Sequence, residues 1–299
     1  MYVILGATGN TGSVVARKLL DGGKKVRVVG RDSKKLAPFV GRGAEAFAAD
    51  VLDTDALSRA FAGAEAAYVL IPPDVKSPDY RAHQEEVSDS IAKALKTAGV
   101  THTVMLSSYG ADKPDKTGPV VALHNMETKL ARISGLNALH LRAAYFMENT
   151  LAQVGVIQSF GMMAGPVRGD LLVPMIATKD IGAAAEALVR LDFKGQKTRE
   201  LLGQRDISYN EAARIIGVAI GKPALAYVQL PDEQVIQAMT GMGISKSLAM
   251  LLCEMAGSMN NGYMKALEPR TAANTTPTSF ETFVQEVFLP VFKGQAASA

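Results

Sequence analysis

The sequence predicts an α/β protein with a doubly wound parallel sheet and a smaller, mostly helical C-terminal domain. Short apolar runs alternate with helical patterns from residue 2 to residue 141 of the 299-residue chain, which gives six strand–helix units. Parallel strands need crossovers of a dozen or more residues, so this alternation indicates a parallel sheet with helices on both faces. Beyond about residue 204 short helical patterns predominate.

The expected elements follow the apolar pattern in chain order. Strands are predicted at 2–5, 25–30, 44–48, 66–71, 103–106 and 138–141, and helices at 33–40, 54–62, 79–98 and 119–134, with a first helix from residue 14. Further helices are predicted at 145–158, 180–191, 209–220, 232–239, 246–259 and 279–288, with an irregular stretch at 160–174 and a frayed tail at 295–299. Residues 1–142 with about 173–203 are expected to form the sheet domain. About 143–172 and 204–299 are expected to form a substrate or lid domain.

The composition excludes several classes of protein. Charged residues make up 20% of the chain and hydrophobic residues 48%, and the net charge of +3 is too small to favour nucleic acid or an acidic membrane. No run of about 18 apolar residues is present, and the chain enters a strand at once, which leaves no room for a signal peptide. Cys253 is the only cysteine, so neither a disulfide nor a metal site is expected. A cytoplasmic protein with no membrane contact, either a monomer or a homodimer, is the resulting expectation.

A glycine-rich turn joins the first predicted strand to the first helix. Gly6 would allow a sharp turn, Gly9 a close approach of backbone to a pyrophosphate, and Gly12 close packing of helix on strand. The free N–H groups of the helix would face the phosphates. The turn is therefore expected to bind a dinucleotide, although a turn without ligand fits the glycine spacing alone. The contacts would come from Gly6, Thr8, Gly9, Asn10, Thr11 and Gly12.

The end of the second strand favours NADP(H) over NAD(H). Ligands of an open parallel sheet lie beyond the carboxyl ends of its strands. At the end of the second strand, NAD-binding proteins usually carry an acidic residue. Arg31 stands there instead, followed by Lys35, and a guanidinium suits a 2′-phosphate. Asp32 is expected to cap the next helix. A solvated basic turn is the alternative for Arg31.

Other strand ends supply further candidate contacts. Asp50 could accept from the adenine amino group, with Val51 beside it, or could serve only as a turn residue. The loop Ile71, Pro72 and Pro73 would line the nicotinamide side, together with Ser107 from the end of the fifth strand.

Several motifs resemble the NmrA-like group of atypical short-chain dehydrogenase/reductases, relatives of the isoflavone-reductase-like enzymes. They are Gly-Ala-Thr-Gly-Asn-Thr-Gly at 6–12, Gly-Arg-Asp at 30–32, Gly-Ala-Glu at 43–45 followed by Asp50, Leu-Ile-Pro-Pro at 70–73, Ser-Gly-Leu at 134–136 and Leu-Arg-Ala-Ala-Tyr-Phe-Met-Glu-Asn at 141–149. The resemblance is specific over residues 1–150 and weak at 178–182. Ala143 departs from it, because the family often has proline there. The resemblance implies an NAD(P)-binding Rossmann fold whose members are quinone, dye or phenylpropanoid reductases, or redox sensors.

The Tyr-x-x-x-Lys pair of ordinary short-chain dehydrogenases is missing from the expected helix, where Val120 and His124 stand instead. Tyr109 to Lys113 has the same spacing but follows the strand directly and is bounded by Pro114, so it should not be helical. In isoflavone-reductase-like enzymes a lysine corresponds to His124. His124 is thus the candidate proton donor, with a packed structural histidine as the alternative.

The predicted function is hydride transfer from NADP(H) to a quinone or similar conjugated small molecule, which can take its proton from solvent. Tyr145 is expected at the cofactor, and Tyr109, Phe146 and Met147 at the acceptor. Met162, Met163 and the segment 239–243 would form the opposite wall. The main alternative is a non-catalytic NADP(H) sensor that acts through a protein partner, without direct binding to nucleic acid. A sugar-nucleotide epimerase fits less well, because it would need the missing Tyr-x-x-x-Lys pair.

Overall fold

Seven parallel strands form the central sheet in a computed structural model that describes residues 1–295. Most of the tail expected to fray, residues 296–299, lies outside the described residues. The sheet has the order β10-β6-β5-β4-β1-β2-β3. Its strands are β1 (Tyr2–Leu5), β2 (Val26–Gly30), β3 (Glu45–Ala48), β4 (Ala66–Val69), β5 (His102–Ser108), β6 (Asn137–Ala143) and β10 (Gln196–Leu201). The predicted fold class is confirmed.

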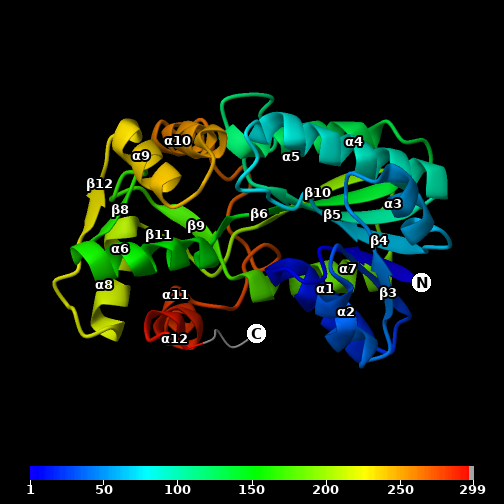
Figure 1. Cartoon of the computed structure of the whole chain (residues 1–299), viewed down its shortest axis with the longest axis horizontal. Coiled ribbons are helices and arrows are strands. Elements are labelled where there is room, and N and C mark those ends of the chain that lie inside the picture. Colours follow the sequence, from blue (N-terminus) through cyan, green and yellow to red (C-terminus); the bar gives the residue numbers. More distant parts are fainter. Residues whose placement is uncertain (296–299) are drawn as a thin grey trace.

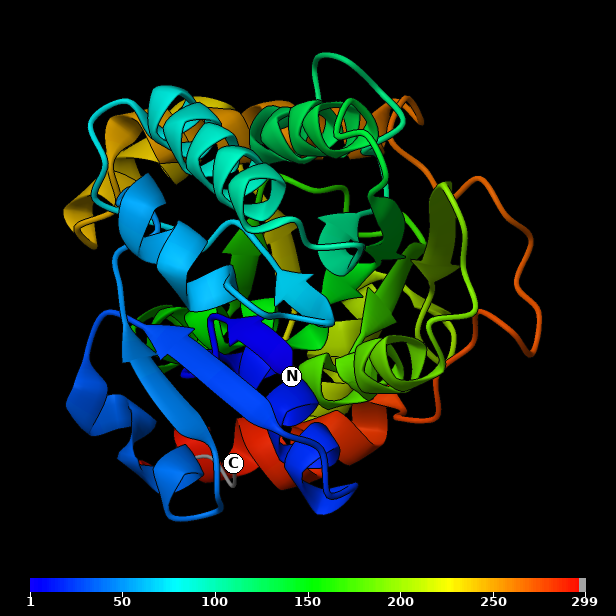
Figure 2. The same cartoon turned by 90° about the vertical axis from the view of Figure 1, so that its right-hand side faces the viewer.

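Helices cover both faces of this sheet, as Figure 1 shows. One face carries α1 (Asn10–Asp21), α2 (Ser33–Val40) and α7 (Ala183–Arg190), and the other carries α3 (Thr54–Phe61), α4 (Tyr80–Ala98) and α5 (Val121–Ala131). In Figure 2 the cyan α4 and green α5 lie above the sheet, and the blue α1 and α2 lie below it. Two apolar cores result, one on each face.

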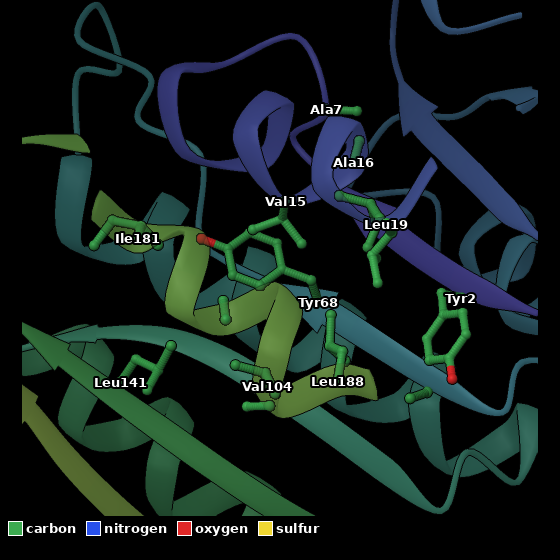
Figure 3. Packing of buried hydrophobic residues seen from close by; sticks show 14 of the residues in the cluster. Tyr2, Ala7, Val15, Ala16, Leu19, Tyr68, Val104, Leu141, Ile181 and Leu188 are labelled. Atoms are coloured by element: carbon green, nitrogen blue, oxygen red, sulfur yellow. The ribbon is translucent and has the colours of Figure 1, made fainter. Parts of the chain in front are cut away.

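Tyr68 of β4 lies fully buried at the centre of one core. Val15 and Leu19 come to it from α1, and Leu188 comes from α7 (Figure 3). The spacing of Val15 and Leu19 places both on one side of the helix, which is why α1 presents an apolar stripe to the sheet. This packing fixes the start of α1 relative to the strand ends.

Aspartates begin three of the helices on the sheet. The side chains of Asp32, Asp53 and Asp79 accept hydrogen bonds from backbone N–H groups in the first turns of α2, α3 and α4. Asp32 accepts from Lys34 N at 2.9 Å, so its predicted capping role is confirmed.

The segment after β6 differs from the sequence prediction. The helix expected at 145–158 is wrong at its start, because β7 (Tyr145–Phe146) is a short strand that pairs with β9 (Val173–Ile176). A 3-10 helix (Met147–Ala152) and α6 (Gln153–Phe160) follow. The stretch 160–174, expected to be irregular, contains β8 (Met163–Gly165) and the start of β9.

The remaining elements are mostly helical and lie in the left half of Figure 1. They are α8 (Tyr209–Ala219), α9 (Asp232–Gly241), α10 (Lys246–Asn260), α11 (Phe280–Phe283) and α12 (Leu289–Phe292), with the short strands β11 (Asp206–Ile207) and β12 (Tyr227–Gln229). Strand β11 extends the small sheet of β7 and β9, and β12 pairs with β8. The predicted division into two domains stays a prediction. Residues of about 173–203 are expected in the sheet domain as one segment. Of the two strands in this segment, β10 joins the large sheet but β9 lies in the small one.

Within residues 1–295, none of the helices combines the length and the apolar character needed to cross a membrane. The same residues contain no gathering of three or more His, Cys, Asp or Glu side chains suited to a metal ion.

Candidate functional site

The candidate site lies where the strand order of the large sheet reverses, between β1 and β4. Loops leaving two neighbouring strands there run in opposite directions and open a crevice. A Cβ added to Gly6, after β1, would lie 3.1 Å from a methyl carbon of Leu70, after β4, so the two loops are in contact. A cavity of about 620 Å³ begins at this point and extends toward α10. A hollow of similar size, about 630 Å³, lies elsewhere around Ser258 and Tyr263 and contains none of the predicted site residues.

The glycine turn has the local geometry that its sequence predicts. Gly6 has φ of +65°, in the left-handed region, and its carbonyl oxygen accepts from Gly9 N at 2.9 Å. A Cβ at Gly12 would overlap the carbonyl oxygen of Gly6 and lie 2.9 Å from that of Leu5. The close approach of α1 to β1 therefore requires glycine at position 12, which confirms that expectation.

The start of α1 fits the pyrophosphate of a dinucleotide. Gly9, the N-cap, has no side chain to satisfy the first N–H groups of the helix, and the first turn contains no acidic residue. Asn10 and Thr11 follow it in the cavity wall. A 12-residue helix with free N–H groups and an uncompensated positive end attracts an anion. Of the six predicted pyrophosphate contacts, five line the cavity, and Gly12 is buried behind them.

The adenosine-end candidates lie on the surface beside this turn. Arg31 and Lys35 are exposed, and a Cβ on Gly30 would contact the Thr8 side chain at 3.8 Å. Arg31 follows Gly30 directly, so it lies next to the glycine turn. Within the described residues Arg31 makes no ion pair and no side-chain hydrogen bond. Its guanidinium is therefore available to a ligand.

Asp50 serves as a turn residue in this structure. Its carboxylate accepts from Leu52 N at 2.9 Å, and the residue is exposed. Val51 is half-buried and packs against the core below α3. Neither residue lines the cavity, so the predicted contacts with adenine stay predictions.

The ends of β4 and β5 form the middle of the cavity. Ile71, Pro72 and Pro73 line it, and so does Ser107, while their contacts with the nicotinamide stay predictions. The Ser107 hydroxyl donates to Glu127 Oε1 at 2.6 Å, and Arg142 donates to both oxygens of the same carboxylate at 3.1 and 2.7 Å. Sequence reasoning missed this network, because Glu127 occupies an ordinary helix position and its partners are distant in the chain.

His124 does not line the cavity, although its helix neighbours Val120 and Leu123 do. Its Nδ1 lies 2.9 Å from the Ala111 carbonyl oxygen and, since that oxygen can only accept, carries the proton. The ring thus ties α5 to the turn after β5. Tyr109 and Lys113 stand in this turn and not on a helix, which confirms that their spacing does not form the catalytic pair.

The far end of the cavity has a wall that differs from the predicted one. Tyr145, Phe146 and Tyr109 line it as expected, but Met147 is buried in the core. The opposite wall expected from Met162, Met163 and 239–243 is wrong, because these residues lie elsewhere. Met242 is 61% exposed and Met163 is buried. The opposite wall consists instead of Tyr80 and Gln84 from α4, Leu252 and Met255 from α10, and Met264.

Hydrogen bonds hold α10 against the start of α4. Tyr80 N donates to Ser247 Oγ at 3.0 Å, and Ser245 N donates to the Val75 carbonyl oxygen at 2.8 Å. These contacts join residues far apart in the sequence, so local patterns could not reveal that α10 closes the cavity.

Two tyrosines contribute hydroxyl groups to this end of the cavity, and both hydroxyls stay protonated. Burial raises the pKa of Tyr145, against hydrogen bonds with Tyr209 and Asn149 that lower it. Burial also raises the pKa of Tyr109, reinforced by Tyr145 and Asp206. Both hydroxyls can therefore donate hydrogen bonds at neutral pH but cannot act as bases there.

A Rossmann-type sheet with a glycine turn and a cavity at its switch point defines a nucleotide-binding protein. The model of the NmrA-like family matches residues 2–284, and the chain belongs to that family. A curated relative, the NAD(P)H azoreductase of Xenophilus azovorans, is 31% identical over 258 residues, which are 85% of this chain and 86% of the relative.

Solved structures share the fold. The NADPH-dependent quinone oxidoreductase of Escherichia coli, solved with NADPH, has a TM-score of 0.76 at 22% identity and covers 100% of this chain and 96% of its own. The triphenylmethane reductase of Citrobacter sp., solved with NADP(H), has a TM-score of 0.79 at 19% identity and covers 95% and 99%.

Proposed function

We propose that this protein is a reductase that uses NAD(P)H, with NADPH preferred, to transfer hydride to a quinone or a similar conjugated small molecule. The observation that carries the proposal is one continuous cavity, which joins the start of α1 to a wall of aromatic, leucine and methionine side chains. The azoreductase of Xenophilus azovorans and the two structural relatives support the same class of reaction.

Each part of the cavity would have a separate task. The N–H groups at the start of α1 would bind the pyrophosphate, and Arg31 would pair with a 2′-phosphate. Bound there, the nicotinamide supplies the hydride. Ile71, Pro72 and Pro73 would hold the nicotinamide side without competing N–H donors at the prolines. The apolar wall would exclude water and orient a flat acceptor against the ring.

The chemistry would require little from the protein as an acid. A conjugated acceptor that gains a hydride becomes an anion that water can protonate, so a quinone and NADPH with one solvent proton give a quinol and NADP⁺. His124 lies outside the cavity lining, in agreement with a reaction in which no side chain must deliver that proton. A role for His124 as proton donor stays a weaker proposal.

The test is NADPH oxidation, followed by its absorbance, with a panel of quinones, azo dyes and enones. We expect acceptor-dependent oxidation with at least one quinone. Tight NADPH binding without oxidation by any acceptor would contradict the proposal and favour the alternative, a redox sensor that acts through a protein partner. The control is Gly12→Ala, whose turn would not bind the dinucleotide.

A further inference from the structure

Gln84 is a buried amide in the wall of the cavity, on the first turns of α4. It is 5% exposed, and no described residue hydrogen-bonds to its side-chain oxygen. Tyr80 lies one helical turn earlier and lines the same cavity. A buried amide oxygen without a partner is unfavourable, so native proteins rarely keep one unless a ligand or water completes it.

Three hydroxyls that line the cavity are already engaged within the protein, whereas the buried Tyr109 hydroxyl has no hydrogen-bond partner among the described residues. Ser107 donates to Glu127, Ser108 donates to the Tyr109 carbonyl oxygen at 3.0 Å, and Thr178 donates to Glu148. Near Gln84 the wall is apolar, since Leu123 comes from α5 and Leu252 and Met255 come from α10. The amide, with the Tyr80 hydroxyl one helical turn away, is thus one of a few polar groups in a mostly apolar wall, an arrangement typical of a specificity contact.

The chemistry of an amide suits an oxygen that changes its hydrogen-bonding role. A quinone carbonyl only accepts a hydrogen bond, whereas the hydroxyl of the quinol also donates one. A primary amide presents N–H to the first and its oxygen to the second after a half-turn of its terminal group. A carboxylate cannot donate to the carbonyl oxygen, and an ammonium group cannot accept from the hydroxyl.

We infer that Gln84 is a specificity-determining residue, whose amide recognises a hydroxyl or carbonyl oxygen on an aromatic acceptor. The inference rests on the proposed function, in which this cavity holds the acceptor. It predicts discrimination between aromatic ligands of equal size that differ only in one oxygen substituent. A site built to hydrogen-bond such a group rejects the analogue that lacks it, because the amide is then left unpaired.

The experiment measures binding and needs no turnover. The probes are 2-naphthol and 2-methylnaphthalene, in which a methyl group replaces the hydroxyl, with the protein saturated by NADP⁺. Their own fluorescence reports binding, and the chain contains no Trp to interfere. We expect wild-type protein to bind 2-naphthol about tenfold more tightly, the effect of one hydrogen bond made in a buried site. Gln84→Leu should bring the two dissociation constants within about twofold of each other, mainly by weakening 2-naphthol binding.

One control variant and one replacement variant test whether the buried amide itself makes the contact. Gln237→Leu makes the same change at an exposed position of α9 and should keep the preference. Gln84→Met replaces Gln84→Leu if thermal unfolding shows that the leucine variant is not folded. A preference that persists in the folded Gln84 variant would overturn the inference, and so would its absence from wild-type protein. Loss of NADP⁺ affinity with the preference intact would also overturn it, because the amide would then serve the nicotinamide.

The same proteins distinguish this inference from the proposed function. If the wild type discriminates between the probes through Gln84 but oxidises NADPH with no acceptor, the recognition stands and the reductase proposal fails. If acceptors are reduced but Gln84→Leu keeps the preference for 2-naphthol, the reductase proposal stands and the role of Gln84 fails.

Discussion

Glu127 of α5 and Arg142 of β6 form a two-point ion pair at the carboxyl end of the sheet. Their side chains are only 11% and 12% exposed. The Ser107 hydroxyl donates to the same carboxylate, so one buried group fixes the ends of both β5 and β6. In this arrangement the Ser107 oxygen keeps only its acceptor role toward the cavity.

Glu127→Gln should lower the free energy of unfolding by about 3 kcal/mol, because it leaves the Arg142 guanidinium buried without its counter-charge. Urea unfolding measures the change. The double variant Glu127→Leu with Arg142→Met should lose less than the sum of the two single changes. Glu186→Gln, at an exposed pair with Arg190, should change stability by less than about 0.5 kcal/mol. Equal effects at positions 127 and 186 would contradict this account.

Gly12→Ala should destabilise the protein by about 2 kcal/mol and abolish dinucleotide binding, because the added methyl group overlaps the Gly6 carbonyl. Thermal unfolding and NADPH titration measure the two effects. Gly155→Ala is the matched control. It lies exposed within α6, and a Cβ there would meet nothing within 4 Å, so alanine should stabilise slightly through its helix propensity. Normal NADPH affinity in Gly12→Ala would remove the turn from the binding site.

Arg31→Glu should weaken NADPH binding at least about tenfold and NADH binding less than about threefold, because only NADPH carries the 2′-phosphate. Dissociation constants for both dinucleotides test this. Arg59→Glu makes the same charge change at an exposed position of α3 and should leave their ratio unchanged. An equal loss for both dinucleotides in Arg31→Glu would refute the proposed contact.

His140 should make the protein less stable in acid. Burial lowers the pKa of this side chain, whose Nε2 lies 3.1 Å from Gln196 Oε1. Below about pH 6.5 the unfolded chain binds a proton that the folded chain resists, so stability is present above that pH and falls as the pH decreases. His140→Leu should lose less stability than wild type between about pH 7.5 and 5.5. The same substitution at His83, half-exposed on α4, should retain the wild-type loss.

His124→Gln should lower the free energy of unfolding by about 1 kcal/mol, the contribution of its bond to the Ala111 carbonyl. Its kcat with a confirmed acceptor should fall less than about threefold, since an acid outside the cavity contributes little to the barrier. Steady-state kinetics decide the matter. A decrease of about 100-fold, with the loss of an ionisation from the pH profile, would restore His124 as the proton donor.

The sequence predicted those strands and turns that a local pattern of residues determines. Apolar runs marked the strands β1 to β6, of which β3 is an exposed edge strand, and the glycine spacing marked the turn at Gly6 to Gly12. Backbone conformation and close packing act within a few residues. The turn at the start of α1 was therefore predictable. Strand β10 was missed, since four of its six residues are exposed and give no apolar run. Strand β7 has two residues, too few for a pattern to define.

The far end of the cavity could not be predicted, because long-range contacts form it. Met255 and Met264 line the cavity, whereas Met162, Met163 and Met242 do not. The sequence segments around the two groups of methionines are similar in composition and spacing. What distinguishes them is the docking of α10 on the loop after β4, through bonds such as Ser245 N to the Val75 carbonyl. Gln84 gave no signal for the same reason. The place of Gln84 in the cavity wall depends on which helix lies opposite α4.

The exposed sequence of β10 has a consequence for how this molecule meets its own copies. An unpaired sheet edge offers free N–H and C=O groups to any extended chain, and natural proteins oppose such strand addition with charged side chains. Lys197 and Arg199 stand exposed along this edge. A second copy that added its own β10 there would bring these positive charges close together. The exposed polar residues of β10 gave no apolar run in the sequence. The same residues therefore also protect the open edge against aggregation.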